Sequence, residues 1–163
     1  MSTFDPEAIL RVLTLHEVRF VLVGGYAAQL HGASRPTRDV DITPDTDRRN
    51  LGQLAQALKE LDARIRTDAE HEGLPFRTSA DALTGLRMLN LVTKFGDLDI
   101  TVEPSGVGGY QAWLGGSRVR RVGTVSVRVA GLRDIITSKE AASRTKDVVA
   151  LPELLRLIAE LDE

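Results

Sequence analysis

A pair of glycines between a short apolar run and two closely spaced aspartates constrains this chain more than any other feature. Residues 20–23 are four apolar side chains in a row and predict a short buried strand. Gly24 and Gly25 follow at once, and glycine lets a backbone turn tightly and approach a ligand closely. Residues 26–31 predict a short helix, and the polar loop 32–38 leads into a second strand.

The second strand carries two carboxylates on one face. Asp39 and Asp41 are two residues apart, so their side chains point the same way along a strand, while Val40 and Ile42 point into the core. Two like charges held close together are costly unless a cation lies between them. Because Mg2+ prefers hard oxygen ligands, the pair predicts a magnesium site beside the glycine turn.

The order of these parts resembles a known superfamily. A strand, Gly-Gly, a short helix and Asp-x-Asp on the next strand form the signature of polymerase-β-type nucleotidyltransferases. The form GGYA, then HG, then RPTRDVDI looks most like the AbiEii/MenT group, the nucleotidyltransferase toxins of toxin–antitoxin systems. The resemblance implies an α+β (α/β) nucleotidyltransferase fold, in which helices pack on a small mixed sheet and a helical segment ends the chain. Many members have Gly-Ser where this chain has Gly24-Gly25, which leaves backbone N–H groups to contact phosphate.

Composition places the chain among single-domain globular proteins. Its 163 residues, 42% of them apolar, suffice for one core, with residues 1–104 as the main body and a hairpin and helices over 105–163. A net charge of −2 excludes a polycation, so any nucleic-acid contact must come from a local patch. The absence of cysteine excludes disulfides and fits a reducing cytoplasm. Neither a signal peptide nor an apolar run of roughly 20 residues is recognisable, so we expect a cytoplasmic protein without membrane contact.

Helical spacing and strand alternation divide the rest of the chain. Asp5 followed by Pro6 predicts a helix start, and apolar residues recur at helical spacing over 51–61. Asp45 and Asp47 precede that second helix and are expected to cap it rather than to bind metal. The other expected elements are a strand over 63–66, a helical turn over 82–86, hairpins over 89–102 and 117–129, and helices over 110–114, 131–143 and 151–158.

A third carboxylate is expected on the second arm of the first hairpin. Asp97, Asp99 and Thr101 alternate with apolar residues and therefore share one face. In the resembled family the third carboxylate lies on such a strand between apolar neighbours. Asp99, between Leu98 and Ile100, matches that position better than Asp97, which borders the turn and is expected to be more exposed.

Three groups of charged residues have two interpretations each. Arg35 and Arg38, in the loop before the second strand, would either meet a triphosphate or lie solvated at the surface. Arg118, Arg120 and Arg128 make the second hairpin the most basic stretch, either as a solvated face or as an RNA-binding ribbon that contacts phosphates. In the resembled group, later motifs place a lysine on one helix and an aspartate near the start of the next, and Lys139 and Asp147 match these positions. In the other interpretation, Lys139 is a surface charge and Asp147 is a helix cap.

The resemblance implies a chemistry and a biological role. Two Mg2+ ions would clamp the displacement at the α-phosphate of a nucleoside triphosphate, held by Asp39, Asp41 and Asp99. Gly24 and Gly25 would cradle phosphate, Lys139 would neutralise triphosphate charge, and Asp147 would orient either Lys139 or the base. The implied acceptor is RNA, with the tRNA 3′ end foremost, and the implied partner is a cognate antitoxin. The alternatives are an enzyme that modifies a small acceptor, as aminoglycoside nucleotidyltransferases do, and an inactive binding partner or antitoxin with the same fold.

Overall fold

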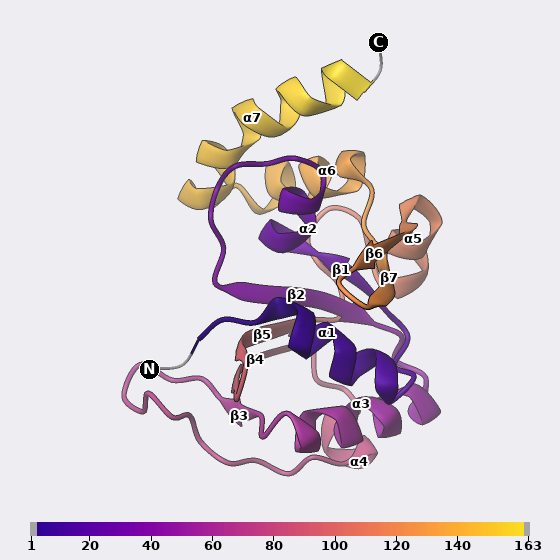
Figure 1. Cartoon of the computed structure of the whole chain (residues 1–163), viewed down its shortest axis with the longest axis vertical. Coiled ribbons are helices and arrows are strands. Elements are labelled where there is room, and N and C mark those ends of the chain that lie inside the picture. Colours follow the sequence, from indigo (N-terminus) through magenta and orange to yellow (C-terminus); the bar gives the residue numbers. More distant parts are fainter. Residues whose placement is uncertain (1–2, 162–163) are drawn as a thin grey trace.

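A mixed sheet of seven strands organises residues 3–161, the part of the chain that the computed structural model describes (Figure 1). The strand order is β3-β4-β5-β2-β1-β7-β6, in which β2 pairs with β5 and β1 with β7 in parallel, and every other pair is antiparallel. Met1 and Ser2, at the start of the segment considered as a signal peptide, lie outside these residues. The strands are β1 (Phe20–Val23), β2 (Asp39–Pro44), β3 (Arg64–Ile65), β4 (Met88–Thr93), β5 (Gly96–Thr101), β6 (Arg118–Val122) and β7 (Val125–Val129).

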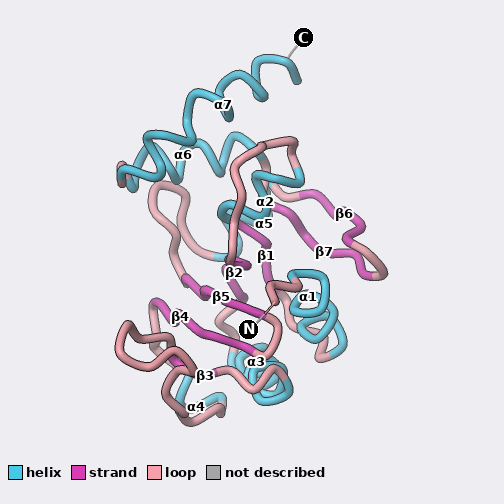
Figure 2. Tube along the Cα trace, turned by 60° about the vertical axis from the view of Figure 1, so that its left-hand side comes forward, coloured by secondary structure: helices cyan, strands magenta, loops and turns pink. Residues whose placement is uncertain are grey.

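Helices cover both faces of this sheet and confirm the expected mixed fold. In Figures 1 and 2, α2, α6 and α7 lie on one side of the sheet, and α1 and α3 lie on the other. α3 presents Leu51, Leu54 and Leu58 to the core, and each fully buried leucine contributes about 1.5–3 kcal/mol. The helices are α1 (Pro6–Leu15), α2 (Gly24–Leu30), α3 (Arg48–Glu60), α4 (Ala80–Leu83), α5 (Tyr110–Gly116), α6 (Leu132–Ala142) and α7 (Thr145–Leu161). No helix among residues 3–161 is both long and apolar enough to cross a bilayer.

The central strands separate apolar from acidic side chains. β1 is buried along its whole length, and β2 alternates, with Val40 and Ile42 fully buried and Asp39 and Asp41 partly exposed. β5 repeats the alternation, since Leu98 and Ile100 belong to the core. The pairing of β2 with β5 therefore stacks one row of carboxylates on one face and one row of aliphatic side chains on the other.

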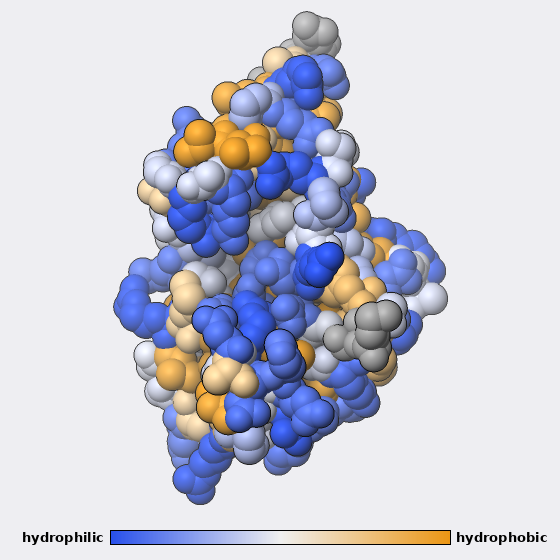
Figure 3. Space-filling model, turned by 90° about the vertical axis from the view of Figure 1, so that its left-hand side faces the viewer, coloured by the Kyte–Doolittle hydropathy of each residue, from blue (hydrophilic) through white to orange (hydrophobic). Residues whose placement is uncertain are grey.

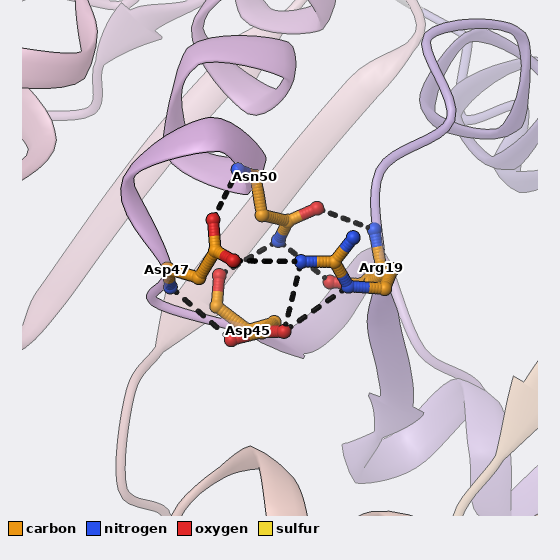
Figure 4. Close-up of polar contacts among 4 residues, drawn as sticks. All are labelled: Arg19, Asp45, Asp47 and Asn50. Atoms are coloured by element: carbon orange, nitrogen blue, oxygen red, sulfur yellow. Dashed lines mark hydrogen bonds and ion pairs between the residues drawn. The ribbon is translucent and has the colours of Figure 1, made fainter.

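A polar network fixes the end of β2 opposite the acidic end (Figure 4). The Arg19 guanidinium donates to the Asp45 carboxylate at 3.1 Å and to the Asp47 carboxylate at 3.3 Å. Asp47 caps α3 by accepting from the Asn50 backbone N–H, and the buried Asn50 amide donates to the carbonyls of Arg19 and Asp45. Asp47 thus caps α3 as predicted, whereas Asp45 accepts from the Asp47 backbone N–H and the Arg19 guanidinium instead and ties the start of β1 to the start of α3.

Several boundaries differ from those expected. α2 begins at Gly24 instead of residue 26, so the glycine pair is itself the first turn of the helix. α4 covers residues 80–83, because Ser79 caps it by accepting from the Ala82 N–H, and does not reach 82–86. The last helix begins at Thr145 and includes Pro152, well before the expected start at 151, because Asp147 stabilises its first turn.

The face of the molecule drawn in Figure 3 combines hydrophilic and apolar side chains. Figure 3 shows a surface that is mostly hydrophilic, with small separate apolar areas. Exposed apolar side chains on α7 include Val148, Val149 and Leu155. Scattered exposed apolar residues of this kind are normal on a folded domain.

Candidate active site

Three carboxylates converge where β2 and β5 lie side by side. Asp39, Asp41 and Asp99 each offer an oxygen, and these oxygens lie within 4.8 Å of one another. The register explains the convergence, because Asp41 pairs with Asp99 and Asp39 with Asp97. The Asp97 side chain is 34% exposed and that of Asp99 only 14%, so the structure brings Asp99 into the group and leaves Asp97 at its edge.

The acidic group is electrostatically unfavourable without a cation. Burial raises the pKa of the Asp41 carboxyl to about 7, and the nearby charges of Asp39 and Asp99 act in the same direction. Burial also raises the pKa of Asp99 to about 6, although the Arg66 guanidinium opposes this shift. Raised carboxyl pKa values in a cluster of this kind are a mark of functional sites, because mutual repulsion is retained where a ligand relieves it.

Gly24 lies against the acidic group, and the turn accepts only glycine there. Its φ of +73° falls in the left-handed region, and a Cβ at Gly24 would overlap the Asp41 carboxylate. A Cβ at Gly25 would press on the Thr37 side chain at 3.2 Å. Thr37 in turn donates its hydroxyl to the Asp39 carboxylate at 3.0 Å. The glycine turn thus brings backbone next to carboxylate, and Thr37, which the sequence did not single out, holds Asp39.

Two lysines of the C-terminal helices act on this group through their charge. Lys139 on α6 and Lys146 on α7 both lower the pKa of Asp41, and α6 and α7 lie on one side of the sheet together with α2 (Figure 1). Asp147, buried to 1% exposure, pairs with Lys139 at 3.7 Å, and whether it orients that lysine or the base in a reaction stays a prediction. It also accepts from the backbone N–H and the guanidinium of Arg144, which closes the start of α7. Burial raises the Asp147 pKa, but these hydrogen bonds and the Lys139 charge outweigh it and leave the pKa lowered.

Solved structures of similar shape share this architecture. The lincosamide antibiotic adenylyltransferase LnuA, solved with lincomycin bound, superposes with a TM-score of 0.61 at 14% identity, over 95% of this chain and 99% of that one. A provisionally assigned nucleotidyltransferase from Thermotoga maritima gives 0.56 at 15% identity, over 94% and 96%. The antibiotic-resistance factor ANT(2″)-Ia gives 0.55 at 17% identity, over 96% and 88%. No protein-family model and no curated protein matches the sequence.

The chain has the nucleotidyltransferase fold. Within this fold the three carboxylates converge beside the glycine turn, and the charges of Lys139 and Lys146 act on Asp41. The similarity to LnuA and ANT(2″)-Ia extends over nearly the whole chain, so the hairpin β6–β7 and the helices α6 and α7 fall within the shared fold together with the acidic strands.

The arginines expected near the triphosphate lie in the loop before β2. Arg35 is exposed, and its carbonyl accepts from the Gln29 side-chain amide at 2.7 Å. Its charge acts on Glu153, whose pKa is lowered chiefly by a hydrogen bond from Ser34. Arg38 is exposed directly before Asp39. A contact of either arginine with triphosphate stays a prediction.

The basic hairpin does not present its three arginines together. Arg118 pairs with Val129 and Arg120 with Val127, so these two arginines share a face as predicted. Arg128 pairs with Val119 and lies on the opposite face. Arg120 also donates to the Leu30 carbonyl at 2.7 Å, which fixes its guanidinium near the end of α2. The prediction that Arg118, Arg120 and Arg128 form one basic ribbon is therefore wrong for Arg128, which lies on the opposite face.

Arg66 contacts the acidic group, although no sequence pattern singled it out. Its guanidinium donates to Asp99 at 2.7 Å and lies 3.4 Å from Asp97. The residue follows β3, and its backbone N–H donates to the Asn90 carbonyl on β4. Asn90 pairs with Asp99, so the register of three strands places Arg66 beside a carboxylate far away in the sequence. No local pattern indicates such a contact.

The donor set fits a hard divalent cation. The converging ligand atoms are carboxylate oxygens, which suit Mg2+, and the described residues place no sulfur or imidazole among them. Asp41 and Asp99 have raised pKa values that a bound cation would lower. The residues that would hold the ion are therefore Asp39, Asp41 and Asp99.

Proposed function

We propose that this protein is a Mg2+-dependent nucleotidyltransferase that transfers a nucleoside monophosphate from a nucleoside triphosphate to a hydroxyl group. The observation that carries the proposal is the convergence of Asp39, Asp41 and Asp99 within 4.8 Å, beside the Gly24 turn. The positive charges of Lys139 and Lys146 act on Asp41 and would offset the negative charge that a triphosphate brings. The shared fold with adenylyltransferases agrees with this chemistry.

Each side chain has a role that follows from its place. Asp39 and Asp41 would bind the ion that accompanies the triphosphate, and Asp99 would complete the set for a second ion; bound Mg2+ neutralises phosphate charge and polarises the reacting oxygens. Asp99 would also help to take the proton of the acceptor hydroxyl through a carboxylate oxygen. Lys139, held by Asp147, would stabilise the charge that develops on the leaving pyrophosphate.

Two classes of acceptor are supported by different observations. LnuA is a lincosamide adenylyltransferase, and ANT(2″)-Ia has been solved with adenylyl-2″-tobramycin, which favours a small hydroxylated acceptor for this chain. The resemblance of GGYA, HG and RPTRDVDI to the AbiEii/MenT group favours RNA, with the tRNA 3′ end foremost. The exposed Arg118 and Arg120, which share a face, agree with a phosphate contact. With an RNA acceptor the protein would act as a toxin and would have a cognate antitoxin.

An inactive partner with the same fold is less well supported. Such a protein has no need for three converging carboxylates, a group in which the pKa of Asp41 is raised to about 7. It also has no need for a buried aspartate paired with a lysine whose charge acts on Asp41. The cost of keeping these charges together favours an active site.

The deciding experiment supplies each labelled ribonucleoside triphosphate with Mg2+ and one acceptor class at a time. One arm contains purified tRNA and total RNA, and the other contains a panel of lincosamides and aminoglycosides. Label on either class supports nucleotidyl transfer and selects the acceptor. Absence of label from both classes, with nucleotide still bound, would favour the inactive partner. The Asp41→Asn variant is the control for label that arises without this site.

A further inference from the structure

Arg66 occupies a position from which it acts on the acidic group without being one of its ligands. Its guanidinium contacts Asp99 at 2.7 Å and Asp97 at 3.4 Å, and it also donates to the Leu91 carbonyl at 3.1 Å. The side chain is 33% exposed, so it is held between strand backbone and carboxylates rather than free in solvent. Arginine stays charged at any physiological pH, and its fork keeps two donors fixed relative to each other.

The contact is selective within the acidic group. Arg66 bonds Asp99, which belongs to the converging three, and pairs with Asp97, which does not. Asp39 is held instead by Thr37, and Asp41 lies against Gly24. The two carboxylates on β2 are thus available to a cation, and the one on β5 already has a cationic partner.

We propose that Arg66 is a positioning residue that holds Asp99 in place for the second metal position and that its charge competes with divalent cations in the nucleotide-free protein. This inference rests on the proposed function and names the residue that regulates filling of the same site. The guanidinium lowers the net negative charge that a cation meets at the three carboxylates. It also fixes one oxygen of Asp99, which leaves the other for the cation or the acceptor hydroxyl.

The inference predicts opposite effects on metal affinity and on catalysis. Arg66→Ala should tighten binding of Mn2+ to the nucleotide-free protein about tenfold at pH 8, because a positive charge next to the site is removed. The same variant should lower kcat about 10–100-fold with little change in the KM for nucleotide, as expected when a partner of a metal ligand is removed. A residue with a merely structural role would lower both affinity and rate when replaced.

The experiment measures Mn2+ binding by calorimetry and by electron paramagnetic resonance, and transfer to the acceptor class found active. Arg66→Lys should keep Mn2+ affinity near that of the wild type and restore part of kcat, since it keeps the charge but not the fork. Arg87→Ala is the matched control, because Arg87 makes an exposed ion pair with Glu103 at 3.2 Å, and it should change neither quantity. Arg66→Gln replaces Arg66→Ala if the alanine variant does not fold.

Two outcomes would overturn the inference. If Arg66→Ala bound Mn2+ no more tightly than Arg87→Ala does, Arg66 would not compete with the cation. A parallel decrease of Mn2+ affinity and kcat would show that Arg66 has a structural role. Failure of the proposed function gives a different result. Wild-type protein would then transfer no nucleotide to any acceptor, while the Mn2+ comparison would still decide the role of Arg66.

Discussion

Asp41 and Asp99 lie directly opposite each other in the parallel pairing of β2 and β5. Because paired residues point to the same face, strands distant in the sequence deliver adjacent carboxylates. Asp39, one pleat earlier on β2, completes the group within 4.8 Å. Single substitutions can measure what each of these three carboxylates, and each charged residue around them, contributes.

The first prediction concerns the two aspartates on β2. Asp39→Asn and Asp41→Asn should each reduce nucleotidyl transfer by at least about 100-fold, because each removes a charged oxygen ligand from the site. The fold should survive, since both side chains are partly exposed and the replacement is isosteric. Transfer rates and circular dichroism of the purified variants are the measurements. Transfer at the wild-type rate in either variant would exclude that residue from catalysis.

A second prediction follows from the raised pKa of Asp41. In the folded protein without metal its pKa is about 7, above the ordinary value, so the folded state binds more protons than the unfolded state between about pH 4 and 7. The contribution of Asp41 to stability is therefore largest below this window and disappears as the pH rises through it. Asp39, Asp99, Lys139 and Lys146 face the same carboxyl and set the size of the effect.

Thermal unfolding in EDTA and in Mg2+ at pH 5 to 8 measures this effect. Asp41→Asn should raise Tm at pH 8 in EDTA, and each kcal/mol gained corresponds to about 2–4 °C for a chain of this size. Mg2+ should raise the Tm of the wild type at pH 8 and have little effect on Asp41→Asn. A wild-type Tm that does not respond to Mg2+ at pH 8 would contradict the metal site.

The third prediction separates Asp99 from Asp97. Asp99→Ala should lower the rate about 100-fold or more, because Asp99 belongs to the converging three, whereas Asp97→Ala should lower it less than about tenfold. Both residues contact Arg66, so removal of an ion pair is common to the two variants and cancels in the comparison. A crystal with Mg2+ and nucleotide gives the ligands directly. Coordination by Asp97 in place of Asp99 would show that the metal lies beside the Asp39–Asp97 pair instead of the Asp41–Asp99 pair.

The fourth prediction concerns the lysine on α6 and its buried partner. Lys139→Ala should lower kcat about 10²–10³-fold, the usual cost of removing one group that stabilises developing charge. Asp147→Asn should lower it about tenfold, because the amide keeps the hydrogen bond at the start of α7 but no longer holds Lys139 by charge. Kinetics with each nucleotide and unfolding curves of both variants separate catalysis from stability. Unchanged kinetics in Lys139→Ala would make it a surface residue.

The fifth prediction concerns the acceptor. If RNA is the acceptor, Arg118→Ala combined with Arg120→Ala should weaken RNA binding and reduce its log–log salt slope by about one for each phosphate that these side chains bind. Nucleotide binding should stay unchanged. Arg128→Ala, on the other face of the hairpin, should have a smaller effect on the same binding curves. Equal effects from both faces, or none, would argue against a phosphate-binding face and favour a small acceptor.

The sequence alone determined the parts that depend on neighbouring residues. The alternation of Asp39, Val40, Asp41 and Ile42 predicted which side chains face the core, because the pleat fixes direction at a period of two. Asp5 and Asp47 were recognisable as caps, since a capping side chain reaches only to the next turn of its own helix. The choice of Asp99 over Asp97 combined the apolar neighbours of Asp99 with the resemblance to the nucleotidyltransferases, and its catalytic role stays a prediction.

Only the tertiary structure decided the relations between strands and between helices. The rows that join Asp41 to Asp99, and Asp99 through Asn90 to Arg66, depend on register between segments distant in the sequence, and no local pattern encodes that register. The split of the basic hairpin into two faces, with Arg118 and Arg120 apart from Arg128, follows from the register between β6 and β7. Asp147 reaches Lys139 because α7 packs against α6, and no local pattern specifies that contact between two helices.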